Sequence, residues 1–151
     1  MFNNSQWDKI RKSVLERDNY TCVFCGHRAL KFMNIHHKNE SGDNSLRNLA
    51  TTCVACHAVS HIGLNLSLGI IEIWKSKLPQ VEIVRRTRRG IKKGLTLKEI
   101  KKKLPLERGP YPVGSVIYAN ELIEKMRNSP RAYLKEPLCA VFVKLKRWQV
   151  E

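Results

Sequence analysis

Two pairs of cysteines, each separated by two residues, offer the clearest chemistry in this chain: Cys22 with Cys25, and Cys53 with Cys56. A C-x-x-C turn lets two thiolates reach one ion, and two such turns complete the tetrahedral shell of a structural zinc site. A disulfide framework is the competing interpretation. The chain opens without an apolar signal segment, and disulfide pairing leaves the fifth cysteine, Cys139, unmatched. The pattern therefore favours one zinc ion held by four cysteines.

All five histidines of the chain lie between or just after these cysteine pairs. His36 and His37 are adjacent, His57 directly follows the last cysteine of the second pair, and His61 comes four residues later. Imidazole binds metal ions or accepts a proton near neutral pH, because its unperturbed pKa is about 6.5. Neighbours on a strand point to opposite faces, whereas His57 and His61 share one face of a helix. For His61, as for His27, an ordinary surface or hydrogen-bonded histidine is the alternative.

The elements that must hold these side chains can be predicted from periodicity and turn residues. Apolar residues at helical spacing predict a helix over residues 5–17, with Ser5 and Asp8 in an approximate capping box. The elements expected after it are a strand over residues 30–37, a polar loop over 38–46, a strand over 49–52 and a helix over 54–77.

This order of strand, loop, strand and helix, with its histidines and cysteines, resembles the HNH endonuclease family. That family folds as a ββα-metal unit, often beside a four-cysteine zinc site. The matching segments are WDKIRKSVLERDNYTCVFCG, NIHHKN and NLATTCVACHAVSH, and they cover roughly residues 7–61. The resemblance implies an α+β nuclease domain over residues 1–78 that hydrolyses DNA phosphodiester bonds, as a nicking or homing-type enzyme.

The resemblance also implies a role for each motif residue. His37 would be the general base that activates water, and Asn48 would hold the loop and orient that base. His36 and His57 would bind the catalytic divalent metal, with His61 as a candidate additional ligand. Many members carry aspartate where this chain has His36, and imidazole suits Mn, Co, Ni or Zn better than Mg. The expected cofactors are a structural Zn and a catalytic Mg or Mn, with Ni or Zn as candidates.

The net charge of +15 on 151 residues predicts a polyanionic partner, and DNA fits better than a membrane surface. No apolar run approaches the ~18 residues that a membrane span needs. We therefore expect a cytoplasmic DNA-binding protein. The sequence leaves open whether it is a monomer or a homodimer.

The positive charge is densest over residues 85–103, where Glu99 is the sole acidic residue. We expect residues 79–109 to form a basic linker or arm, with a short helix that starts at a Thr96–Glu99 capping box. Phosphate contacts are expected from its basic side chains: Arg85, Arg86, Arg88, Arg89, Lys92, Lys93, Lys98, Lys101, Lys102 and Lys103.

Residues 110–151 are expected to form a small α+β accessory module. Its predicted elements are a strand over residues 113–118, a helix over 120–127 and a strand over 138–145. Cys139 lies in the last of these apolar runs, where a buried small hydrophobic residue is its simplest role.

Two other functions fit the same residues. A non-catalytic, zinc-stabilised nucleic-acid-binding module would keep the cysteines but would not need His37, Asn48 and His57 together. An HNH nuclease that acts on RNA or branched substrates would keep the whole site and differ only in its substrate.

Overall fold

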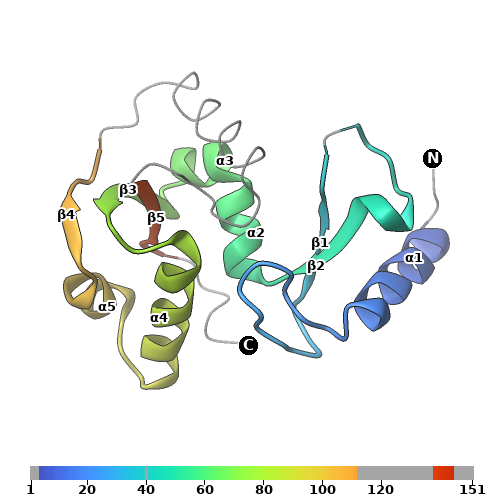
Figure 1. The fold of residues 1–151 in the computed structure, drawn as a ribbon, viewed down its shortest axis with the longest axis horizontal. Coiled ribbons are helices and arrows are strands. Elements are labelled where there is room, and N and C mark those ends of the chain that lie inside the picture. Colours follow the sequence, from blue (N-terminus) through green and yellow to red (C-terminus); the bar gives the residue numbers. More distant parts are fainter. Residues whose placement is uncertain (1–3, 40, 112–137, 145–151) are drawn as a thin grey trace.

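The described residues fold into a mixed α+β structure with two small sheets (Figure 1). The computed structural model describes residues 4–39, 41–111 and 138–144. Two strands form one sheet, in the order β1-β2, and three form the other, in the order β4-β3-β5. The elements are α1 (Asn4–Arg17), β1 (Asn34–His37), the 3-10 turn η1 (Leu46–Asn48), β2 (Leu49–Thr52), α2 (Val54–Ser60), α3 (Ile62–Ser67), β3 (Ile71–Ser76), α4 (Gln80–Lys92), α5 (Leu97–Lys103), β4 (Leu106–Arg108) and β5 (Leu138–Phe142).

The first helix agrees with its prediction, and polar contacts tie its end to the first sheet. Val14 and Leu15 are buried, as the periodicity predicted. Arg17 donates to the carbonyl oxygen of Leu49 at 2.6 Å, and the backbone N–H of Thr51 donates to Asp18 at 2.8 Å. These contacts orient α1 against β2. The capping-box prediction was wrong, because Asn4 is already helical and Ser5 therefore lies inside the helix.

Strands β1 and β2 form an antiparallel hairpin around a polar loop. The second strand begins and ends where predicted, at Leu49 and Thr52. The first begins at Asn34, four residues later than predicted, because Phe32 has a φ of 62° that no strand accommodates. The register pairs His36 with Ala50 and places both histidines of β1 at the loop end of the hairpin.

The single helix predicted over residues 54–77 is wrong. The structure has two short helices that meet at His61, whose φ of −105° and ψ of 48° interrupt the helical hydrogen bonds. Gly69 then adopts a φ of 67°, a conformation that glycine tolerates best, and ends the second helix. The remaining residues form β3, in which buried and partly buried side chains alternate over its first four positions.

The basic stretch that was expected to start as an extended arm is helical. Helix α4 buries Ile83, Val84 and Thr87 on one face, a spacing that the many arginines obscured in the sequence. Gly90 lets the next helix pack closely, since a Cβ there would lie 2.5 Å from Ile100. The predicted capping box of α5 is confirmed, with the Thr96 side chain accepting from the Glu99 N–H.

The last described strand, β5, lies against β3 and belongs to the same core as α1. Its position confirms most of the strand predicted over residues 138–145, and Cys139 is fully buried as expected. The side-chain amide of Gln80 donates to the Ala140 carbonyl at 2.9 Å and accepts from the Ala140 N–H. One buried cluster runs from Val14 to Phe142, across the boundary expected at residue 78. The elements predicted over residues 113–118 and 120–127 lie outside the described residues.

Within the described ranges, none of the helices has both the length and the apolar character needed to cross a membrane.

Candidate functional site

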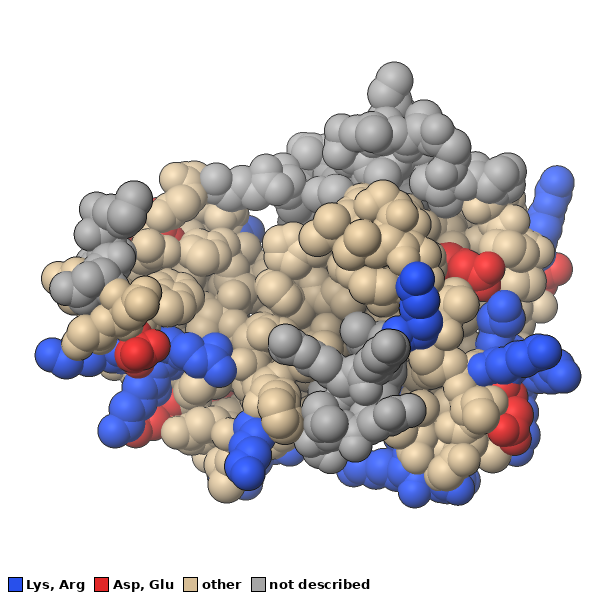
Figure 2. All heavy atoms as spheres, turned by 180° about the vertical axis from the view of Figure 1, so that it is seen from behind, with Lys and Arg blue, Asp and Glu red and all other residues tan. Residues whose placement is uncertain are grey.

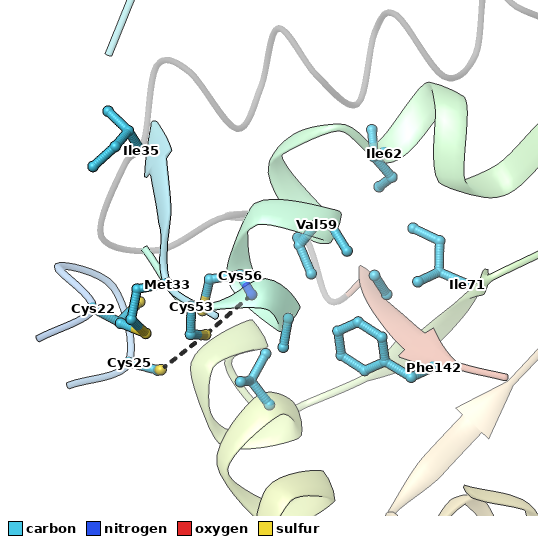
Figure 3. Close-up of a cluster of buried hydrophobic side chains, with 14 of the residues drawn as sticks. Cys22, Cys25, Met33, Ile35, Cys53, Cys56, Val59, Ile62, Ile71 and Phe142 are labelled. Carbon is cyan, nitrogen blue, oxygen red and sulfur yellow. Dashed lines mark hydrogen bonds between the residues drawn. The ribbon is translucent and has the colours of Figure 1, made fainter. Parts of the chain in front are cut away.

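The four cysteines come together from two elements and face one another in the core (Figure 3). Cys22 and Cys25 lie in the turn after α1, while Cys53 caps the N-terminus of α2 and accepts from the Cys56 N–H at 3.4 Å. All four sulfurs lie within 4.8 Å of one another, and Cys25 and Cys53 are 3.6 Å apart. Tetrahedral zinc with Zn–S bonds of about 2.3 Å separates its sulfurs by about 3.8 Å. The cluster therefore fits a structural metal such as zinc.

The electrostatics of the cluster also favour a cation. Hydrogen bonds from neighbouring thiols, that of Cys25 first, lower the pKa of Cys22. The pKa of Cys25 is pushed up by Cys22, but hydrogen bonds with Cys53 and Cys56 outweigh this and bring it to about 7. The pKa of Cys53 and that of Cys56 are raised, because each of these thiols donates first to Cys22 and holds its own proton. Without a cation, four buried thiolates cannot coexist so close together, whereas a divalent ion would stabilise all of them.

Helix α4 reaches the cysteine cluster through two arginines. Arg88, 7% exposed, donates from Nη1 to the Cys25 sulfur at 3.6 Å. Arg85 donates from Nε to the Cys25 carbonyl at 3.1 Å. Both residues were expected to contact phosphates. Arg88 instead faces inward, where its positive charge lies beside thiolate sulfur and out of reach of a nucleic-acid backbone.

Three of the predicted site histidines gather beside this cluster: His36 near the end of β1, His57 on α2 and His61 directly after α2. The Nε2 atoms of His57 and His61 lie 3.0 Å apart, and the His36 and His57 rings meet edge-on with centroids 6.4 Å apart. Burial, followed by the charge of His61, lowers the pKa of His36 and that of His57 to about 4. Both rings are therefore neutral at pH 7 and have lone pairs available for a metal ion.

These histidines form a more open arrangement than the cysteines do. In the described ranges, 4–39, 41–111 and 138–144, one group of three or more metal-binding side chains has ligand atoms that converge closely. That group is the four cysteines. The four cysteines form the closed shell that suits a structural ion.

His37 belongs to the opposite face of β1, as the alternation of strand side chains predicted. Its ring stacks on that of Trp7 from α1, with an interplanar angle of 2° and centroids 6.2 Å apart. Its Nε2 lies 2.8 Å from the side-chain oxygen of Asn44. The structure thus holds the imidazole from two sides, and neither contact with His37 was predicted from the sequence.

Asn48 lies 5% exposed at the base of the hairpin loop and organises the loop backbone. Its side chain donates to the Asp43 carbonyl at 2.6 Å and accepts from the Asn39 N–H at 3.1 Å. Its own carbonyl accepts from the Lys38 N–H at 2.8 Å. These contacts fix the loop backbone on both sides of residue 43.

The remaining basic residues differ in how free they are to bind an anion. Arg86 and Arg89 each lie 3.9 Å from Glu82. Lys101 contacts Glu72 at 3.1 Å and lies over the Trp74 ring. Figure 2 shows basic side chains spread around the rim of one face, with acidic ones among them. The exposed lysines on α4, on α5 and between them are Lys92, Lys93, Lys98, Lys102 and Lys103.

No protein-family model matches the chain. A stretch of 86 residues is 31% identical to a protein named type 4 apparatus protein DotN from Legionella pneumophila subsp. pneumophila. The match covers 53% of this chain and 39% of DotN, so the chain spans well under half of that protein's length.

Proposed function

We propose that this chain is a metal-dependent nuclease of the HNH type that hydrolyses DNA phosphodiester bonds. The observation that carries the proposal is the meeting of His36 with His57 and of His57 with His61 at the loop end of the β1–β2 hairpin, where His37 follows His36 on the other face of the strand. The order of β1, loop, β2 and α2 supports a ββα-metal unit. The cysteine cluster beside it would be its structural zinc site.

The proposed chemistry assigns each side chain a separate task. His37 accepts a proton from the attacking water, because a neutral imidazole is a base near neutral pH. The neutral rings of His36 and His57 offer nitrogen ligands, and His61 lies close enough to His57 to add a third. A divalent ion held there would stabilise negative charge on the phosphate oxygens and the leaving group. Nitrogen donors favour Mn, Co, Ni or Zn over Mg.

The proposed substrate surface includes the exposed lysines of α4, α5 and the turn between them. Their charges would contact the phosphate backbone without reading sequence. Arg88 is left out of this surface because it is buried against Cys25.

The test is incubation of the purified, zinc-loaded protein with supercoiled plasmid, first with EDTA and then with Mg, Mn, Co, Ni or Zn restored in turn. Cleavage that depends on the added metal and disappears in His37→Ala would support the proposal. The thermal unfolding of His37→Ala, measured in parallel, shows whether the variant is folded. Cleavage by His37→Ala at the parental rate would reject His37 as the base. An RNA or branched substrate added to the same series tests the alternative substrate classes.

A non-catalytic zinc-stabilised binding module is a second candidate. The similarity to a protein named as part of a type 4 apparatus favours it, since such a name describes an assembly rather than a hydrolase. A parental protein that retains its zinc and binds DNA but leaves every substrate intact with each metal would favour this module over the nuclease.

A further inference from the structure

We infer that Asn44 is a positioning residue that fixes the tautomer and orientation of His37. This inference deepens the proposed nuclease function and rests on it, because His37 needs a particular bare nitrogen only if it acts as a base. The sequence assigned the orientation of His37 to Asn48, but the direct contact to the imidazole comes from Asn44.

The contact itself determines which ring nitrogen is basic. Asn44 Oδ1 lies 2.8 Å from His37 Nε2, and an amide oxygen accepts hydrogen bonds but cannot donate them. Of the two neutral tautomers, the one protonated on Nε2 is the one that can donate to this oxygen, so the contact favours a proton on Nε2. Nδ1 is left with the lone pair, so Nδ1 is the nitrogen that takes a proton from water.

The backbone on both sides of Asn44 is held in place by the loop's own hydrogen bonds. Asn48 donates to the Asp43 carbonyl at 2.6 Å. The N–H of Ser45 donates to the Asp43 carboxylate at 2.8 Å, and the Ser45 hydroxyl donates to the same carboxylate at 2.9 Å. Asn48 therefore acts on His37 indirectly, through the backbone that presents the Asn44 amide.

Trp7 restricts the imidazole from its flat side. The nearly parallel rings, with an interplanar angle of 2°, favour one tilt of His37, while Asn44 Oδ1 selects one rotation about the ring normal. A base held in one tautomer and one orientation does not need to reorganise when water is activated. Asn44 acts as a positioning residue because it fixes both the tautomer and the orientation of His37.

The experiment reads the tautomer directly and the turnover separately. A long-range nitrogen–proton correlation spectrum of the ¹⁵N-labelled, zinc-loaded protein distinguishes the protonated ring nitrogen of His37 from the bare one, and it is recorded at about pH 8, above the reference range for histidine side chains. The variants are Asn44→Ala, which removes the acceptor, and Asn44→Asp, which keeps an acceptor oxygen. Ser41→Ala is the matched control, because Ser41 bonds within the same loop, to Asn39 and Asp43, without a bond to His37.

The parent and Ser41→Ala should show the proton on Nε2. Asn44→Ala should lose this preference and lower kcat by up to about 100-fold with little change in KM, as the misplacement of a catalytic group does. Asn44→Asp should restore the tautomer. A parental proton on Nδ1, or an Asn44→Ala variant with unchanged tautomer and kcat, would overturn the inference. If the parent cleaves nothing yet shows the Nε2–H tautomer that Asn44→Ala loses, the nuclease proposal fails and the coupling of Asn44 to His37 is supported.

Discussion

Arg88 Nη1 lies 3.6 Å from Cys25 Sγ, although the two residues are 63 positions apart in the chain. This contact joins a helix of the C-terminal half to the first cysteine pair. Zinc bound by four thiolates carries a net negative charge, which a buried guanidinium stabilises. Arg88, one of ten basic residues expected to contact phosphates, is therefore part of the surroundings of the cysteine cluster.

Replacing Arg88 with methionine should weaken zinc binding while leaving the apolar packing of α4 largely intact. Removal of a hydrogen-bond partner outside the ligand shell typically lowers metal affinity by about 10- to 100-fold. Competition with a coloured zinc chelator measures the change. Arg86→Met, at an exposed position of the same helix, is the matched control and should retain the parental affinity. Equal affinities for both variants would contradict a role for Arg88 at the site.

Cys56→Ser should remove zinc and destabilise the whole described structure, since metal binding contributes folding free energy and the cluster lies in the core. Elemental analysis of the parent should find about one zinc per chain, the content of a four-cysteine site. The control is Cys139→Ala, which removes a buried thiol of the second hydrophobic cluster and should leave the zinc content unchanged. A zinc-free parent would remove the basis for this prediction.

Stability should decrease between pH 6.5 and about 4 because of His36 and His57. Burial, followed by the charge of His61, lowers the pKa of each to about 4, so the unfolded chain binds their protons first as the pH falls. The contribution of these two neutral rings to the free energy of unfolding is fully present above pH 6.5 and is lost as the pH falls towards 4. Each accounts for on the order of 2 kcal/mol after allowance for partial exposure.

Urea unfolding of the parent and of a His36→Gln, His57→Gln double variant over this pH range isolates the histidine contribution. The cysteines contribute to the pH dependence of both proteins alike, so their contribution cancels when one pH profile of the free energy of unfolding is subtracted from the other. The variant should show a shallower decrease, and identical pH profiles would mean that both rings remain solvated.

Neutralising Lys92, Lys93, Lys98, Lys102 and Lys103 together should weaken binding to all DNA sequences to a similar degree. The slope of log binding constant against log salt concentration should contain a contribution of about 0.9 from every lysine that pairs with a phosphate. Removing all of these contacts should therefore reduce the magnitude of the slope by up to about 4.5. Fluorescence anisotropy at several salt concentrations measures the slope. Cleavage at saturating DNA should continue, because the histidines are unchanged. A salt slope equal to that of the parent would show that these lysines do not bind the DNA backbone.

The features that could be predicted from the sequence are those set by local chemistry. The spacing of the cysteines predicted their convergence, and the Thr96–Glu99 capping box and strand β2 were placed correctly. The break at His61 and strand β3 were missed, because the apolar residues after Val54 fit a helix as well as they fit a helix followed by a buried strand.

Long-range contacts explain what the sequence could not predict at the site. Arg88 was interpreted as a surface charge because nothing near it in the chain reveals that α4 packs on the first cysteine pair. Asn44 was one polar residue among many in its loop, and its contact with His37 depends on how that loop folds back over the hairpin. Asn44 and His37 are separated by a turn, and Arg88 and Cys25 lie far apart in the chain. The spacing of apolar residues in the sequence predicts neither contact.

The paired hydrogen bonds between Gln80 and Ala140 have a consequence for self-association. Among the described strands, β5 lies at the edge of its sheet, where unpaired backbone groups would invite another chain to add a strand. The Gln80 amide occupies both the N–H and the carbonyl of Ala140, as a neighbouring strand would. One side chain thus blocks the middle of this edge against intermolecular β-pairing, a safeguard against aggregation that needs no additional strand.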